Sequence, residues 1–421
     1  MERYPIIASN GSITGYVTSG GEFTALFDKN GARLGTYMWL SHERAIRVDE
    51  FVKKGFLIVG NYIIDVEKLL EDIPWPLIYV SGKSVDEYIE WVKRSIGNIL
   101  NGKKVLVNFS GGKDSLSALY VLAKLSEVVD GLKIYAAYVH VSFLEPTRNI
   151  EFVSKAAEKL GAELILLEAD RSLVKKRLLE DGLPYRGWRW CTYLKLKPIK
   201  ILKRRFEHDF IADGDRMTEA FKRFKRLYQM SPKKPRLITG NRIRPIYVLT
   251  LLDVIKITRS SGLIHPDYLE GLPRVACLLC PYIVPHELAS LDLNKLEDPG
   301  LAEHALRKSY DRDYRDLGIP WEDFMEQHLW RHNPRTAYIL WRVKRILERH
   351  ELEEINAKDV NNMYKSIWLN PLPRAREVRP DEATTYLSQA IAPAFEKLKE
   401  HIVDGYREMG LRWEAEEVKK V

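Results

Sequence analysis

Along the middle of the chain, apolar runs typical of buried strands alternate with segments that carry apolar residues at helical spacing. This pattern is expected of a parallel sheet whose strands are joined by helices. Residues 132–141 are almost continuously apolar, as in a strand buried on both faces. Residues 116–122 and 150–160 carry apolar side chains at helical spacing, and Gly161 ends the second helix. We therefore predict an α/β domain with a doubly wound parallel sheet over residues 81–290, its strands at 105–109, 132–141, 162–167 and 210–214.

The pattern changes on both sides of this domain. Residues 1–80 contain short apolar runs separated by turns, which predicts a small β-rich module with helical pieces at 41–48 and 66–73. Residues 291–421 predict a helical C-terminal domain, including a long helical segment at 383–421. The role of the N-terminal module stays open between nucleic-acid binding and packing on its neighbour.

The composition is that of a globular protein. With 421 residues, of which 45% are hydrophobic, the chain suits two or three domains. No apolar run approaches the roughly 20 residues of a membrane span, and the first residues lack the basic and apolar regions of a signal peptide. Three cysteines argue against a disulfide framework. We expect a cytoplasmic protein, and the scarcity of glutamine beside abundant Lys, Arg and Glu favours a thermophilic source.

The net charge of +8 is unevenly distributed. Residues 171–244 hold 22 Lys and Arg against 7 Asp and Glu, so the rest of the chain is acidic. A single nucleotide does not require so many cations, although a solvated surface would accept them. The segment therefore predicts a polyanionic partner, most simply RNA.

Six residues between the first predicted strand and the first helix carry the strongest chemical signal. They are Ser110, Gly111, Gly112, Lys113, Asp114 and Ser115. Two glycines let the backbone turn tightly and approach a ligand, and the free N–H groups at the helix start form an anion site. Hydroxyls and the Lys113 charge add further donors. The position at the carboxyl end of a parallel strand is where ligands bind in such folds.

The three cysteines give a second signal. Cys277 and Cys280 form a C-x-x-C pair, and Cys191 lies among aromatic residues. Three thiolates suit an iron–sulfur cluster with one open iron. Zinc is a weaker alternative that would need a fourth ligand such as His265, His286 or water. Redox or structural thiols remain a third possibility. Trp188, Trp190 and Tyr193 are candidates for shielding a cluster.

These motifs together resemble the phosphoadenosine phosphosulfate (PAPS) reductase family of the adenine-nucleotide alpha-hydrolase, or PP-loop ATP pyrophosphatase, superfamily. The resemblance spans residues 105–285. It rests on the loop at 110–115; Arg189-Trp190-Cys191-Thr192 with Leu194, Lys195 and Pro198; the run from Gly214 to Glu219; and the run from 243 to 281, with His265, Tyr268, Arg274, Cys277 and Cys280. It implies ATP cleavage between the alpha and beta phosphates, with pyrophosphate held by the loop.

Two departures from the reductases narrow the function. The chain has no cysteine after Cys280, so the C-terminal catalytic thiol of the reductases is missing, and Thr192 stands where cluster-bearing reductases have a second cysteine. The intact Lys113 and Asp114 favour real ATP cleavage. The resemblance then implies an ATP-dependent sulfur transferase that adenylates an acceptor, tRNA or another nucleic acid, and inserts sulfur from a 4Fe-4S centre on Cys191, Cys277 and Cys280.

The same reading assigns roles to charged residues. Lys195, Arg216 and Arg274 are expected to neutralise phosphate or developing negative charge, with ion pairing as the alternative role. Asp114 is expected to assist Mg²⁺. A sulfide or a donor protein would supply the sulfur. Two other functions stay open: an adenylyl-sulfate reductase that uses an external thiol, and a non-catalytic nucleic-acid-binding protein on the same fold. The oligomeric state is not predicted.

Overall fold

The central sheet of the α/β domain has the predicted doubly wound order. The computed structural model describes all residues except 1, 67–75, 231–234, 290, 409 and 411–421. Strands follow the order β12-β11-β10-β13-β15-β14. β10 pairs in parallel with β11 on one side and with β13 on the other, which makes this the point where the strand order reverses. The strands are β10 (Lys104–Asn108), β11 (Lys133–His140), β12 (Glu163–Glu168), β13 (Phe210–Ala212), β14 (Ile238–Thr239) and β15 (Arg242–Ile243).

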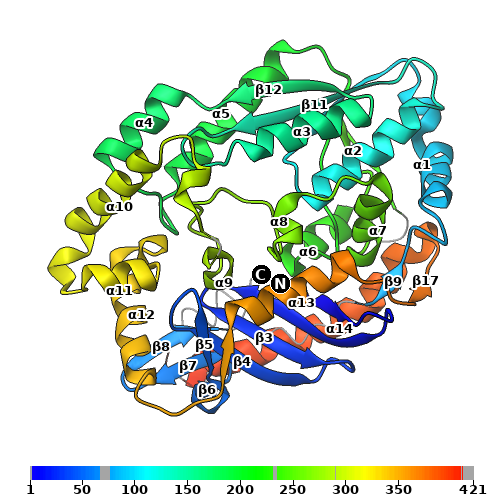
Figure 1. The fold of residues 1–421 in the computed structure, drawn as a ribbon. Helices are drawn as coiled ribbons and strands as arrows, with labels where there is room; N and C mark the ends of the chain where they lie inside the picture. Colours follow the sequence, from blue (N-terminus) through cyan, green and yellow to red (C-terminus); the bar gives the residue numbers. More distant parts are fainter. Residues whose placement is uncertain (1, 67–75, 231–234, 290, 409, 411–421) are drawn as a thin grey trace.

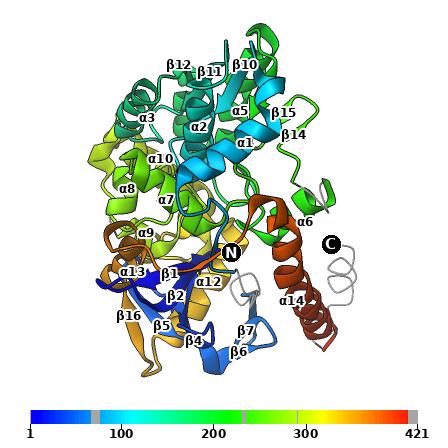
Figure 2. The same ribbon diagram turned by 90° about the vertical axis from the view of Figure 1, so that its right-hand side faces the viewer.

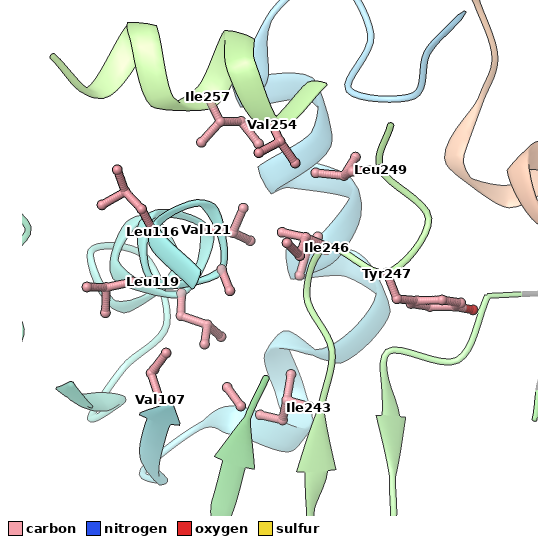
Figure 3. Close-up of a cluster of buried hydrophobic side chains, with 14 of the residues drawn as sticks. Val107, Leu116, Leu119, Val121, Ile243, Ile246, Tyr247, Leu249, Val254 and Ile257 are labelled. Carbon is pink, nitrogen blue, oxygen red and sulfur yellow. The ribbon is translucent and has the colours of Figure 1, made fainter. Parts of the chain in front are cut away.

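Helices cover this sheet, and α2 (Lys113–Ser126) has no exposed residue. Figure 3 shows Leu116, Leu119 and Val121 of α2 among Val107 of β10 and the apolar residues 243–257. Because α2 is enclosed on nearly all sides, its apolar side chains do not form one stripe. The other helices of the domain are α1 (Val85–Leu100), α3 (Arg148–Lys159), α4 (Arg171–Glu180), α5 (Trp190–Arg205), α6 (Phe221–Met230), α7 (Leu251–Ser261), α8 (Pro266–Leu269) and α9 (Pro285–Leu288). The predicted helices at 116–122 and 150–160 are confirmed.

The N-terminal module is an antiparallel sheet of β1 (Tyr4–Ile7), β2 (Ile13–Gly20), β3 (Phe23–Asp28), β4 (Arg33–Trp39) and β5 (Arg44–Arg47), beside a smaller sheet of β6 (Val52–Lys53), β7 (Phe56–Val59) and β8 (Tyr62–Asp65). The helix predicted at 41–48 is wrong, because β5 pairs with backbone on both of its sides. Most of the helix predicted at 66–73 lies outside the described residues.

The C-terminal region is largely helical and folds back onto the N-terminal module. It contains α10 (Pro299–Asp313), α11 (Trp321–Glu326), α12 (Pro334–Leu347), α13 (Ala357–Leu369) and α14 (Pro380–Glu408), with β9 (Ile78–Tyr79) paired to β17 (Arg376–Glu377). β16 (Glu354–Asn356) adds the sixth strand to the N-terminal sheet. Residues 354–356 therefore belong in space to the module that begins the chain.

The two sheets lie at opposite ends of the molecule, with α8 and α9 between them (Figure 1). α14 runs beside α6 and away from the body of the protein (Figure 2). In the part of the chain that the structure describes, no helix combines the length and the apolar character that a membrane crossing needs. The segment that follows Tyr268 thus passes between the α/β domain and the N-terminal module.

Candidate active site

The phosphate loop, residues 110–115, has the tight backbone that its glycines permit. It follows β10 directly, Gly111 has a φ of +79°, and Gly112 caps the start of α2. The Ser115 hydroxyl accepts a hydrogen bond from the Ser110 N–H (3.1 Å) and donates one to the Gly112 carbonyl (3.0 Å). These bonds lie within six consecutive residues, so the loop is closed by local contacts.

A second glycine, outside the loop, supports it from behind. Gly214 lies after β13, and a Cβ on it would come within 2.9 Å of the backbone of Asp114 and Ser115. Real side chains do not approach a backbone so closely, so only glycine fits here. The run from Gly214 to Glu219 therefore contributes to the site first through backbone packing.

Asp114 is surrounded by cations. One carboxylate oxygen contacts Arg216 Nε, and the other lies 3.1 Å from Lys113 Nζ. Burial acts to raise the pKa of Asp114, but the Arg216 and Lys113 charges outweigh burial and lower that pKa to about 2. Since both oxygens are already engaged, Asp114 does not fit the expected Mg²⁺ site as it stands.

Arg216 is fully buried, and its nitrogens contact protein groups. Nη1 and Nη2 contact the Glu2 carboxylate at 2.8 and 3.0 Å, and Nη1 also donates to the Thr218 hydroxyl at 3.0 Å. Arg216 therefore forms ion pairs within the protein, which was the alternative to the expected role of neutralising phosphate charge. Glu2 was missed, because nothing in the sequence marks a residue so distant from the loop as its partner.

Two tyrosines also reach the loop. The Tyr268 hydroxyl accepts a hydrogen bond from the Lys113 N–H at 2.8 Å, at the helix start where an anion would bind. The Lys113 ammonium lies 5.7 Å from the ring centroid of Tyr4 in β1. Tyr268 belongs to one of the stretches that carry the family resemblance, whereas Tyr4 has no such signal.

The three cysteines reach one pocket of about 210 Å³. Cys191 comes from the first turn of α5, and Cys277 and Cys280 come from the cysteine segment, which we define as residues 273–283. All three cysteines are free thiols. Ser110 of the phosphate loop lines the same pocket, whose other polar lining residues include Tyr138, Glu145, Asn149, Arg189, Thr192, Lys195 and Arg274.

The pocket has features that suit a three-thiolate centre, although no metal-ready arrangement is formed. Within the described residues, no group of three or more His, Cys, Asp or Glu side chains is placed to hold a metal ion. Arg274 has a buried Nη2 without a hydrogen-bond partner, so this nitrogen can donate to an anionic group. His265 and His286, considered as fourth zinc ligands, are not among the pocket's lining residues. The pocket lining therefore offers thiols and no imidazole as metal ligands.

Burial favours the protonated thiol at Cys191 and Cys277. Burial raises the pKa of Cys191. Burial and then the nearby Glu145 charge raise the pKa of Cys277 well above its ordinary value, against the opposing charge of Lys195. A metal centre on these residues must therefore displace protons as it binds.

Glu145 is the chief site residue that the sequence did not reveal. Its side chain is buried, and it accepts hydrogen bonds from Cys277 Sγ at 3.2 Å, Lys195 Nζ at 2.5 Å and the Tyr138 hydroxyl at 2.9 Å. Burial acts to raise the pKa of Glu145, but Lys195 and the hydrogen bonds lower it to about 2. Its position soon after the carboxyl end of a buried strand is the one sequence feature that could have marked it as a site residue.

The aromatic residues only partly follow expectation. Trp190 is buried beside Cys191, but Tyr193 is 65% exposed and cannot shield a centre. Two further tryptophans, Trp330 and Trp341, lie near cations in the helical C-terminal region. Trp330 is 1% exposed and Trp341 7%, so both are core residues and neither can stack on an RNA base.

The phosphate loop lies at the switch point of a doubly wound sheet, where such folds bind their ligands. Residues 104–283 match the model of the phosphoadenosine phosphosulfate reductase domain. The matched range includes the phosphate loop and all three cysteines.

Two relatives come from Methanocaldococcus jannaschii. The chain is 29% identical to uncharacterized protein MJ0066 over 310 residues, which is 70% of this chain and 58% of the relative. It is 30% identical to uncharacterized protein MJ0973 over 177 residues, which is 41% of this chain and 40% of the relative. The chain thus matches less than two thirds of the length of either relative.

Three solved structures share weaker likeness. They are the U34-tRNA thiolase NcsA from Methanococcus maripaludis with its 4Fe-4S cluster (20% identity, 64% of this chain and 81% of that one, TM-score 0.34), an NMN synthetase from Francisella tularensis (11%, 64% and 94%, 0.29) and an NAD+ synthetase from Burkholderia pseudomallei (14%, 54% and 88%, 0.27).

Proposed function

We propose that this protein is an ATP-dependent sulfur transferase, which adenylates an acceptor and then replaces the activated oxygen with sulfur. One observation carries the proposal: Ser110 of the phosphate loop and all three cysteines line the same pocket. An ATP-cleaving loop and a sulfur centre must act on one substrate atom in turn, so they need a shared volume of this kind.

The residues divide the first step between them. An acceptor oxygen attacks the alpha phosphorus of ATP, the bond from that phosphorus to the bridging oxygen breaks, and pyrophosphate leaves with its electron pair. The N–H groups of residues 110–115 and the Lys113 charge hold the departing pyrophosphate. Arg274, with its unpartnered Nη2, and Lys195 lie in the pocket to stabilise the charge on the alpha phosphate.

The second step replaces AMP with sulfur at the activated acceptor atom. Cys191, Cys277 and Cys280 would hold an iron–sulfur cluster, which when bound supplies sulfur at the iron without a cysteine ligand. Trp190 and the apolar residues around it limit the access of water to this side of the pocket.

The ATP half of the proposal is tested by the products. Protein incubated with ATP and candidate RNA should release AMP and pyrophosphate, measured by ion-exchange chromatography. ADP and phosphate would contradict the assignment.

Iron and acid-labile sulfide, measured after purification without oxygen, test the cysteine half. Reduction of an adenylyl sulfate by an added thiol, without ATP, would instead support the reductase alternative.

We further propose that the acceptor is RNA and that α5 brings it to the pocket. Several cations of residues 171–244 are paired with carboxylates, among them Arg171, Arg177, Arg223, Arg226 and Arg242. The outer face of α5 differs. Lys197, Lys200 and Arg204 are exposed there and form no ion pair in the described part of the chain, beside the exposed Tyr193.

The geometry of α5 makes it a suitable route to the pocket. Its inner face carries Cys191 and Lys195 into the pocket, while the residues of the outer face follow one another at helical spacing. Cations at such spacing hold phosphates, and an exposed tyrosine can stack on an unpaired base.

Salt dependence tests this surface. Replacing Lys197, Lys200 and Arg204 by alanine should weaken the binding of single-stranded RNA and reduce the salt slope by about 0.7 per lost phosphate contact. Fluorescence anisotropy across a range of salt concentrations measures both. The matched control replaces Arg94, Lys133 and Lys155, which are exposed cations outside the basic segment. An equal loss in both triple variants would show that charge alone, and not the α5 surface, governs binding.

A further inference from the structure

A buried ionic cluster lies where the N-terminal module meets the helical C-terminal region. Glu22, in the turn between β2 and β3, is 2% exposed. Its carboxylate contacts Arg331, and it lies 2.8 Å from His332 Nε2 and 2.9 Å from Lys344 Nζ. Arg331 and Lys344 are also buried. Burying an unpaired charge costs free energy, and here the carboxylate is paired with three basic side chains.

One arm of the cluster reaches the cysteine segment. Arg331 contacts Glu22 with Nη2, and its Nη1 donates a hydrogen bond to the carbonyl of Ile283 at 2.6 Å. Ile283 is three residues after Cys280, and its own N–H donates to the Cys280 carbonyl at 3.0 Å. Glu22 thereby fixes the direction in which Arg331 holds the end of the cysteine segment.

A neighbouring arginine, Arg186, also binds the backbone at this end of the cysteine segment. The Arg186 N–H donates to the Arg331 carbonyl at 2.9 Å. Arg186 Nε donates to the Pro281 carbonyl at 2.7 Å, directly after Cys280. Two guanidinium groups thus bind two carbonyls within three residues of the second cysteine.

The other end of the cysteine segment is held by the N-terminal module as well. The Tyr4 hydroxyl in β1 donates to the Pro273 carbonyl at 2.8 Å. Pro273 precedes Arg274, which lines the cysteine pocket, and Cys277 follows Arg274 by three residues. The N-terminal module therefore contacts both ends of the segment. Tyr4 does so directly, and Glu22 does so through Arg331.

We propose that the N-terminal module positions the cysteine pair, with Glu22 and Tyr4 as its positioning residues. The N-terminal module would then help to shape the cysteine pocket without lining it. It does not depend on which centre the cysteines hold, so it stands apart from the proposed sulfur transfer. Without the two contacts the segment would still be attached at its chain ends, but the two thiols would no longer share a fixed spacing with Cys191.

Thiol reactivity in the metal-free, reduced full chain tests the inference. Iodoacetamide labels the three cysteines under native conditions, and peptide mass spectrometry gives a rate for each. Cys191 lies on α5 outside the segment and is the internal reference. Glu22→Gln should raise the rates at Cys277 and Cys280 about fivefold relative to Cys191, since local opening exposes them. Asp49→Asn is the matched control, because the Asp49 carboxylate contacts Thr36 and Arg47 of its own module.

A second variant keeps the test decisive if Glu22→Gln does not fold. Tyr4→Phe removes the hydrogen bond to Pro273 and leaves no buried charge behind. It should raise the rate at Cys277 more than at Cys280, because Tyr4 holds the end nearer Cys277. Equal increases at all three cysteines would mean general loosening and would overturn the inference. So would unchanged ratios in the variants that fold.

Discussion

The phosphate loop and the cysteine segment line the same pocket but owe their shapes to different forces. The loop is closed by hydrogen bonds among Ser110, Gly112 and Ser115, within six consecutive residues. The cysteine segment is shaped by contacts with Tyr4, Arg186 and Arg331, which come from three distant parts of the chain. The loop should therefore resist changes elsewhere in the protein, whereas the cysteine segment should respond to them.

The largest effect is expected where the loop does depend on a distant residue. Gly214→Ala places a Cβ within 2.9 Å of the backbone of Asp114 and Ser115 and must displace the loop. A shift of about 1 Å in a reacting group costs roughly 100-fold in rate, so AMP formation should fall at least that far. Gly300→Ala in α10 is the control, because its Cβ would meet Asp298 at an ordinary 3.6 Å. Normal AMP formation by Gly214→Ala would show that the loop tolerates movement.

Removal of one thiol should affect the cysteine side alone. Cys191→Ser takes away the ligand that α5 would contribute to the proposed cluster, and the iron content after anaerobic reconstitution should fall from about four atoms per chain to a minor fraction. Binding of ATP, followed by calorimetry, should change little, since the loop hydrogen bonds do not involve Cys191. Full iron content in the variant would exclude Cys191 as a ligand.

Substitutions in the Glu145–Lys195 pair should shift the pKa of Cys277 in opposite directions. The Glu145 charge raises the pKa of Cys277 and the Lys195 charge lowers it. Glu145→Gln should therefore move the pH of half-maximal alkylation at Cys277 downward by about one unit, and Lys195→Met should move it upward by a similar amount. Shifts of the same sign in both variants would contradict the opposing roles of the two charges.

Mild acid should loosen the cysteine side before the loop. Burial lowers the pKa of His286 and His332 to about 4, and both lie beside elements that support the cysteine segment. Between pH 6.5 and 4 the unfolded chain binds protons that these folded histidines do not, so stability falls as the pH falls, by up to about 1.4 kcal/mol per pH unit for each histidine. Asp114, with a pKa of about 2, keeps its charge in this range.

Hydrogen exchange followed by mass spectrometry at pH 7 and 5 measures this difference. Amides of residues 273–283 should lose protection at pH 5 while those of 110–126 keep it, after correction for the intrinsic pH dependence of exchange. His332→Gln should make the loss of protection smaller. Simultaneous loss in both segments would indicate a single cooperative unit instead of two differently supported regions.

The sequence was sufficient for the parts of the molecule whose signal is local. Strand and helix periodicity located β10, β11, β12, β13, α2 and α3, because each element carries its own pattern of burial. The phosphate loop was found because six contiguous residues shape it. Where pairing on both sides outweighed the local pattern, as at β5, the prediction of a helix failed.

Tertiary structure decided everything that depends on residues far apart in the chain. It placed Glu145 against Cys277, turned Arg216 from a phosphate ligand into the partner of Asp114 and Glu2, and buried Trp330 and Trp341. Family resemblance grouped the three cysteines, but only the fold brought Tyr4 to Pro273 and Glu22 to Arg331, which contacts Ile283. A hydrogen bond between residues hundreds of positions apart leaves no periodicity in either stretch, so a single sequence contains no pattern from which it can be inferred.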